Sequence, residues 1–88
     1  MSYRVLLDRA AQRDFQALDL GLSERVRERL LTLEENPRPP GVRKLRAIHP
    51  PGYRLRVGDW RILYTVDDRR REVWVYRIKH RSRSYSGR

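Results

Sequence analysis

The sequence predicts a single α+β domain in which two helices pack on one face of a twisted, mostly antiparallel sheet. Three observations lead to this fold class. The first half of the chain has apolar residues at helical spacing, the second half is rich in branched and aromatic residues, and the proline-rich residues 36–41 separate the two. With 88 residues and no internal repeat, the chain is expected to form one domain, residues 1–88. The expected order of elements is strand, helix, helix and then three or four strands, β-α-α-β-β-β(-β).

A short strand and a helix are predicted first. Residues 3–7, YRVLL, are β-prone, and Asp8 directly after them is a suitable N-cap. In the helix that follows, Ala11, Phe15 and Leu18 fall at positions i, i+4 and i+7. This spacing places them on one face of the helix, which is expected to pack on the sheet.

A second helix is predicted from residue 24 to residue 35, with Ser23 as its N-cap. Val26, Leu30 and Leu33 repeat the apolar spacing, while arginine and glutamate occupy the other faces. The sequence NPRPPG that follows ends the helix, because proline cannot continue it.

The remainder of the chain predicts strands separated by turns. The predicted strands are VRKLRAI (42–48), YRLRV (53–57), WRILYTV (60–66) and EVWVYRIK (72–79). The predicted turns are HPPG (49–52), Gly58-Asp59 and DDRRR (67–71), in which Asp67 and Asp68 are interpreted as turn residues.

The two-residue turn Gly58-Asp59 predicts the pairing of the strands on either side of it. The predicted pairs are Val57 with Trp60, Arg56 with Arg61, Leu55 with Ile62, and Arg54 with Leu63. Because side chains alternate between the two faces of a sheet, one face would carry Leu55, Val57, Trp60 and Ile62, and the other Arg54, Arg56 and Arg61. Like charges directly opposite destabilise a sheet by roughly 0.2–1 kcal/mol. The arginines therefore indicate a phosphate-binding surface, although a solvated outer face with arginine stems over apolar surface is the alternative.

The composition supports a polyanionic partner. Lysine and arginine number 21 against 11 aspartate and glutamate, a net charge of +10, which favours nucleic acid, an acidic protein or an anionic membrane surface. The chain has no cysteine, which excludes disulfides and thiolate metal sites and fits a reducing compartment. No apolar run is long enough to span a membrane, and the first residues do not form a signal peptide. A soluble, cytoplasmic protein is expected.

The familiar hydrolytic templates are missing from the sequence. There is no cysteine nucleophile, no Ser-His-Asp arrangement, no glycine-rich phosphate loop and no metal-ligand spacing, so no metal or cofactor is expected. RNA can be cleaved without a metal, because its 2′-hydroxyl can attack the adjacent phosphate. Arginine can stabilise the charge on that phosphate but does not lose its own proton. Proton transfer would then involve His80 or Tyr85, or the reaction would depend mainly on positioning.

The chain resembles the RelE/ParE superfamily of toxins from bacterial type II toxin–antitoxin pairs, and the RelE branch in particular. The residues that carry this resemblance are YRLRVGDWRILY (53–64) and VWVYRIKHRSRSY (73–85), supported by the AAQRDFQAL helix and the NPRPPGVRKLRA link. The resemblance implies a toxin that cleaves mRNA in the A site of the 70S ribosome and thereby inhibits translation. It also implies a cognate antitoxin whose disordered, often acidic segment wraps the toxin.

The catalytic residues that the resemblance implies are Arg54, Arg56, Arg61, His80, Arg81 and Tyr85. Arg61 and Arg81 would stabilise the phosphorane, and Tyr85 would stack on a base. Well-known members carry lysine at the places of Arg54 and Arg56, and lysine can act as a base whereas arginine cannot. The identity of the general base therefore stays open, and His80 becomes a stronger candidate for it. Further cations expected to contact RNA are Lys44, Arg46, Lys79 and Arg83.

Two alternative functions remain open at this point. A ParE-like inhibitor of DNA gyrase would share the fold and would damage DNA while leaving mRNA intact. A non-catalytic RNA-binding module would use the basic sheet face together with aromatic side chains. These aromatic residues are Tyr53, Trp60, Tyr64, Trp74 and Tyr76, most of which are otherwise expected in the core.

Overall fold

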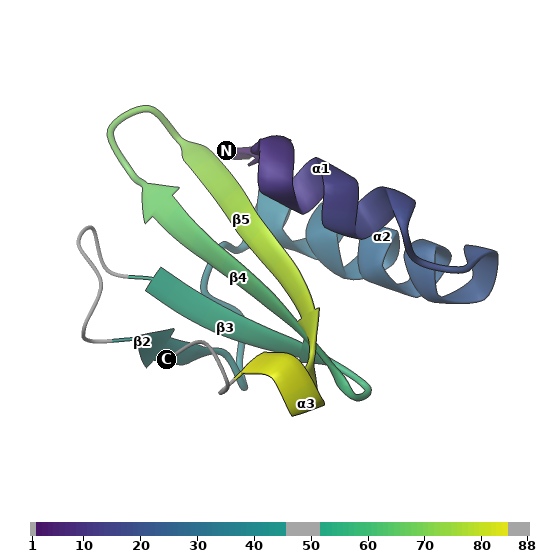
Figure 1. The fold of residues 1–88 in the computed structure, drawn as a ribbon. Coiled ribbons are helices and arrows are strands. Elements are labelled where there is room, and N and C mark those ends of the chain that lie inside the picture. Colours follow the sequence, from purple (N-terminus) through teal and green to yellow (C-terminus); the bar gives the residue numbers. More distant parts are fainter. Residues whose placement is uncertain (1, 46–51, 85–88) are drawn as a thin grey trace.

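The computed structural model describes residues 2–45 and 52–84, without the side chains of residues 83 and 84 (Figure 1). The elements are β1 (Arg4–Leu7), α1 (Arg9–Gln16), α2 (Leu20–Glu35), β2 (Arg43–Leu45), β3 (Gly52–Val57), β4 (Trp60–Asp67), β5 (Glu72–His80) and α3 (Arg81–Ser84). Helices α1 and α2 lie together on one face of the sheet, which confirms the predicted α+β class (Figure 1). The helices within these residues are too short or too polar to cross a bilayer.

The five strands form one sheet in the order β1-β5-β4-β3-β2. Strand β1 is parallel to β5, and the other neighbours are antiparallel. The predicted hairpin is confirmed pair by pair, from Val57 opposite Trp60 to Arg54 opposite Leu63. Gly58 has a φ of 60°, the left-handed conformation that glycine adopts at the first position of such a tight turn. The predicted turn 49–52 lies outside the described residues except for Gly52.

The predicted start of the second helix is wrong by four residues. Helix α2 begins at Leu20, and Asp19 is its N-cap, because the Asp19 carboxylate accepts a hydrogen bond of 2.8 Å from the Leu22 N–H. Ser23 lies within the first turn, where its hydroxyl donates to the Leu20 carbonyl. Gly21 is therefore part of the first turn of the helix rather than of the connection before it. The predicted cap of α1 is confirmed, since Asp8 accepts from the Ala11 N–H at 3.0 Å.

The core lies between the two helices and the face of the sheet that they cover. Ala11 on α1 is buried against alternate residues of β3, β4 and β5, as predicted. The same holds for Val26, Leu30 and Leu33 on α2. The buried hydrophobic residues are Ala11, Val26, Leu30, Leu33, Tyr53, Leu55, Val57, Ile62, Tyr64, Val73, Val75 and Ile78. Trp60 and Phe15 are partly buried at the margin of this core.

Asp14 on α1 fastens the end of β5, where β1 no longer pairs with it. The Asp14 carboxylate accepts a hydrogen bond of 2.8 Å from the Ile78 N–H and pairs with the Arg77 guanidinium at 2.8 Å. The hydrogen bond from the Arg77 guanidinium to the Asp14 carboxylate raises the pKa of Arg77. Beyond Val75, β5 no longer pairs with β1, and the contact with Asp14 holds this part of the strand instead. The contact therefore helps to position residues 79–81, which follow directly.

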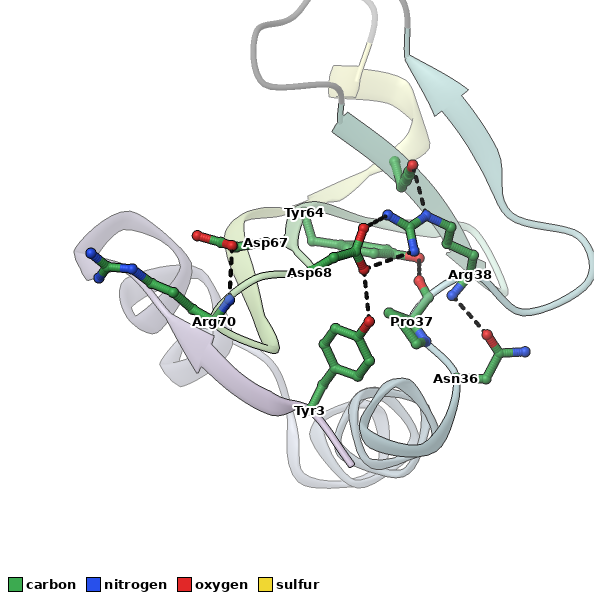
Figure 2. A network of polar contacts seen from close by, with 9 residues as sticks. Tyr3, Asn36, Pro37, Arg38, Tyr64, Asp67, Asp68 and Arg70 are labelled. Atoms are coloured by element: carbon green, nitrogen blue, oxygen red, sulfur yellow. Dashed lines mark hydrogen bonds and ion pairs between the residues drawn. The ribbon is translucent and has the colours of Figure 1, made fainter. Parts of the chain in front are cut away.

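A second polar cluster holds the proline-rich link against the sheet (Figure 2). Arg38 donates to both carboxylate oxygens of Asp68, at 3.2 and 2.9 Å, and to the Tyr53 hydroxyl at 2.9 Å. Tyr3 also donates to Asp68, at 2.7 Å. Asp68 lies in the turn, as predicted, and it also joins three segments of the chain. Asp67 is instead the last residue of β4, and its carboxylate accepts from the Arg70 N–H of the turn.

We expect the Asp68 cluster to make stability depend on pH. The hydrogen bonds from Arg38 and then Tyr3 hold the pKa of Asp68 below its usual value. A carboxylate with a lowered pKa in the folded state stabilises the protein above its unfolded pKa, about 4, and loses that contribution as the pH falls through the folded value. Asp68→Asn should therefore lower the free energy of unfolding at pH 7, and the difference from wild type should shrink below about pH 4. Urea unfolding from pH 7 to pH 3 measures this, and a difference that stays constant with pH would contradict it.

Candidate nucleic-acid interface

Three cations stand in a row across the face of the sheet that α1 and α2 do not cover. Arg56 on β3 is directly opposite Arg61 on β4, and Arg61 is directly opposite Lys79 on β5. Side chains directly opposite in a sheet have Cβ atoms roughly 4.5–5.5 Å apart, so one phosphate can contact neighbouring members of this row. In the adjacent row, Arg43 on β2 lies opposite Arg54 on β3. The predicted sharing of one face by Arg54, Arg56 and Arg61 agrees with this register, and Lys79 joins them.

Arg61, in the middle of the row, is buried. The sequence predicts it on the outer face of the sheet, but only 5% of the residue is exposed. It lies on a central strand between two flanking cations, and α3 packs close to β4. Its Nη1 is 3.4 Å from the Trp60 carbonyl oxygen, and its buried Nε has no hydrogen-bond partner within the described residues. A buried cation without a carboxylate is costly, and an anion entering the row would relieve that cost.

Arg81 lies beside the turn of the hairpin. As the first residue of α3, it donates its backbone N–H to the Asp59 carbonyl at 2.7 Å. Its guanidinium Nη1 is 3.7 Å from the Asp59 carboxylate, and both side chains are largely exposed. Since Arg81 follows Lys79 by two residues, it stands at the end of the sheet next to the three-cation row.

His80 is not brought together with the arginines. It is paired with Trp60, and the two rings meet edge to face with centroids 5.3 Å apart. Alternation along β5 therefore places His80 on the opposite face from Lys79. Its Nδ1 accepts from the Ser82 N–H at 3.2 Å, which in a neutral ring leaves the proton on Nε2. This arrangement separates the only predicted histidine of the site from the three-cation row.

The remaining predicted residues divide into three groups. Lys44 is exposed on β2 but pairs with Tyr53, so it shares the face of Tyr53 and not that of Arg54. Arg46, Tyr85 and the side chain of Arg83 lie outside the described part of the chain. Arg43 was missed by the sequence analysis, although the alternation of VRKL would have shown it once the register with β3 was known.

The aromatic residues are mostly structural. Tyr53 and Tyr64 are buried edge to face, with ring centroids 5.6 Å apart, and Tyr64 donates to the Pro37 carbonyl. Burial raises the pKa of Tyr64 and of Tyr76. Trp74 is 40% exposed, and its indole N–H donates to Glu72. The non-catalytic RNA-binding module therefore loses most of the stacking surface that it was expected to use.

Chemically, the site is an array of positive charge without a metal-binding cluster. No three histidine, cysteine, aspartate or glutamate residues gather as metal ligands within residues 2–45 and 52–84. What the row offers is bidentate N–H donors and positive charge on one sheet face. Such an array binds phosphate oxygens and stabilises negative charge that develops on them.

Comparison with protein families gives a match over residues 5–85, to the model described as the ParE toxin of the type II toxin–antitoxin system, parDE. The chain belongs to this toxin family. The match covers all three helices, the sheet from the second residue of β1 onward and the cation row, so it supports the RelE/ParE resemblance along nearly the entire chain. A comparison with curated proteins found no match.

Several solved structures similar to the toxin are RelE proteins. The toxin resembles the RelE–RelB complex from the archaeon Pyrococcus horikoshii OT3 at 30% identity and a TM-score of 0.82, covering 96% of this chain and 100% of that one. It also resembles the free E. coli RelE toxin carrying a double arginine mutation, at 26% identity and a TM-score of 0.80, covering 96% and 88% of the two chains. The RelBE2 toxin–antitoxin complex from Mycobacterium tuberculosis matches at 28% identity and a TM-score of 0.79, covering 92% and 100%. These matches show that the toxin has the RelE-like fold.

Proposed function

We propose that this toxin is an endoribonuclease that cleaves mRNA in the ribosomal A site and so stops translation. The observation that carries the proposal is the buried Arg61, flanked by Arg56 and Lys79, with an Nε that lacks a partner within the described residues. A surface that only had to fold and stay soluble would gain nothing from this arrangement. A phosphate bound in the row would pair with Arg61 and relieve the repulsion between neighbouring cations, and that relief would add to its binding free energy.

The proposed reaction is a metal-independent transesterification. The 2′-oxygen of one nucleotide attacks the adjacent phosphorus, the bond from phosphorus to the 5′-oxygen breaks, and a 2′,3′-cyclic phosphate and a 5′-hydroxyl result. Arg61 would hold the non-bridging oxygens, where negative charge accumulates in the phosphorane. Arg56 and Arg54 would align the RNA backbone on β3, and Arg81 would contact the phosphate from the start of α3.

The proposed partners follow from the same charge. The net charge of +10 suits both the RNA of a 70S ribosome and an acidic, disordered antitoxin segment. The RelE–RelB and RelBE2 complexes are toxin–antitoxin pairs, which supports an antitoxin that covers this toxin. Cytoplasmic action is part of the proposal, since the ribosome and its mRNA are located there.

The experiment is induced expression in a bacterium, followed by primer extension on a well-translated mRNA. Wild type should give discrete breaks within codons, and Arg81→Ala should remove them. Arg27→Ala, which removes an exposed arginine from α2, is the matched control and should cleave like wild type. Growth arrest by wild type with intact mRNA would overturn the proposal.

A second candidate is inhibition of DNA gyrase, because the matching family model describes a ParE toxin. This function predicts arrested cells with damaged DNA and no breaks in mRNA. The same induction experiment separates the two functions if DNA integrity is measured in parallel.

A further inference from the structure

The three-cation row contains one side chain that can release a proton. Arginine keeps its proton in proteins, so Arg56, Arg61 and the nearby Arg54 can supply charge only. His80 lies on the other face of β5. Lys79 carries an ammonium group, which is a proton donor as well as a charge. If the proposed function holds, the reaction needs a group that protonates the departing 5′-oxygen, and within the row only Lys79 can do so.

The position of Lys79 is fixed from both sides. Ile78 before it is buried in the core, and its N–H is bound by Asp14. His80 after it is held against Trp60. Because both neighbours face the helix side, the side chain of Lys79 is directed to the outer face, directly opposite Arg61. A phosphate whose non-bridging oxygens contact Arg61 therefore has its bridging oxygens within reach of Lys79.

We propose that Lys79 is the general acid of the cleavage reaction, an inference that rests on the proposed ribonuclease function. The bond from the 2′-oxygen to phosphorus forms, and the proton of the 2′-hydroxyl passes to water. The bond from phosphorus to the 5′-oxygen breaks, and that oxygen takes a proton from Lys79 Nζ. The resulting neutral amine regains a proton from water. An alkylammonium group is a stronger acid than the alcohol formed from the 5′-oxygen, so proton transfer to the leaving group is favourable.

The test compares two substrates and one conservative variant in single-turnover cleavage on purified, mRNA-programmed ribosomes. Lys79→Arg keeps the positive charge but cannot donate its proton. On an ordinary codon it should cleave at least about 100-fold more slowly than wild type, while its affinity for the ribosome is unchanged. On a codon in which sulfur replaces the 5′-bridging oxygen at the scissile bond, it should cleave at nearly the wild-type rate, because a thiolate leaves without protonation.

The outcomes separate the inference from the proposed function. Equal losses on the oxygen and sulfur codons would mean that Lys79 acts through charge or folding, and would overturn the inference. Cleavage of the oxygen codon at the wild-type rate by Lys79→Arg would overturn it as well. Wild type that cleaves neither codon would overturn the ribonuclease function itself. Arg27→Lys on α2 is the matched control for a lysine–arginine exchange and should leave both rates unchanged. Lys79→Gln, which is neutral and shorter, should show the same selective recovery on the sulfur codon.

Discussion

Replacing Arg61 with methionine is expected to abolish most mRNA cleavage without unfolding the toxin. Methionine keeps an unbranched apolar stem and removes the guanidinium of a residue that is only 5% exposed and whose Nε has no partner within the described residues. Removing one preorganised donor to a developing oxyanion typically costs about 10²–10³-fold in rate. Replacing a buried charge by an apolar side chain is often neutral or stabilising. The expected result for Arg61→Met is therefore a slow enzyme whose free energy of unfolding equals or exceeds that of wild type.

Two measurements check this expectation on the same preparation. Single-turnover cleavage on programmed ribosomes gives the rate, and urea unfolding gives the stability. Arg27→Met, on the exposed face of α2, is the control for losing an arginine and should change neither quantity appreciably. A large loss of stability in Arg61→Met would show that the guanidinium supports the fold, and the three-cation row would then no longer be evidence for a phosphate site.

The expected gain in stability reflects a conflict between fold and function in the row. Cations directly opposite one another on neighbouring strands destabilise the sheet, and here two such contacts share one buried residue. A bound phosphate or an acidic antitoxin segment reverses the sign of this interaction. The toxin alone is thus expected to be less stable than its complex, because any anion that binds only the folded state adds its binding free energy to that of folding.

Much of the fold follows from local sequence chemistry. The Gly58-Asp59 turn determined the pairing of β3 with β4, and alternation then separated Leu55 and Ile62 from the arginines. The start of α2 did not follow, because two capping residues, Asp19 and Ser23, stand four positions apart and a glycine lies between them. Their local signals are similar, and in the structure the Asp19 carboxylate forms the capping hydrogen bond, to the Leu22 N–H.

The site was harder to predict, because it depends on an irregularity in the sheet. Pairing between β4 and β5 shifts by one residue between Leu63 and Tyr64. Continued without this bulge, the register would place Ile78 opposite Arg61 and Lys79 on the side of Trp60. The shift reverses every side chain after it, which puts Lys79 in the row and His80 on the far face. No residue in EVWVYRIK signals the bulge, so the prediction that His80 would join the arginines could not be corrected from sequence. The burial of Arg61 likewise depends on the central position of β4 and on the nearby α3.

Replacing Ile62 with alanine is expected to destabilise the core strongly. Ile62 is 0% exposed and lies between Leu55 on β3 and Ile78 on β5, both of which are also buried. Truncating such a side chain leaves a cavity and typically costs about 2–5 kcal/mol. A domain of this size has roughly 5–15 kcal/mol of stability in total. Ile62→Ala should therefore lose a large part of its free energy of unfolding, measured in urea at pH 7.

The matched control is the next residue of the same strand. Leu63 faces the opposite side of the sheet and is only partly buried, so Leu63→Ala removes an aliphatic side chain of the same size from the outer face. Its cost should be smaller than that of Ile62→Ala, because the transfer and cavity contributions both scale with burial. The reverse order would mean that the two faces of β4 are exchanged, and with them the placement of Arg61 and Lys79 opposite one another on the outer face. A measurement of core stability thus tests the geometry on which the ribonuclease proposal depends.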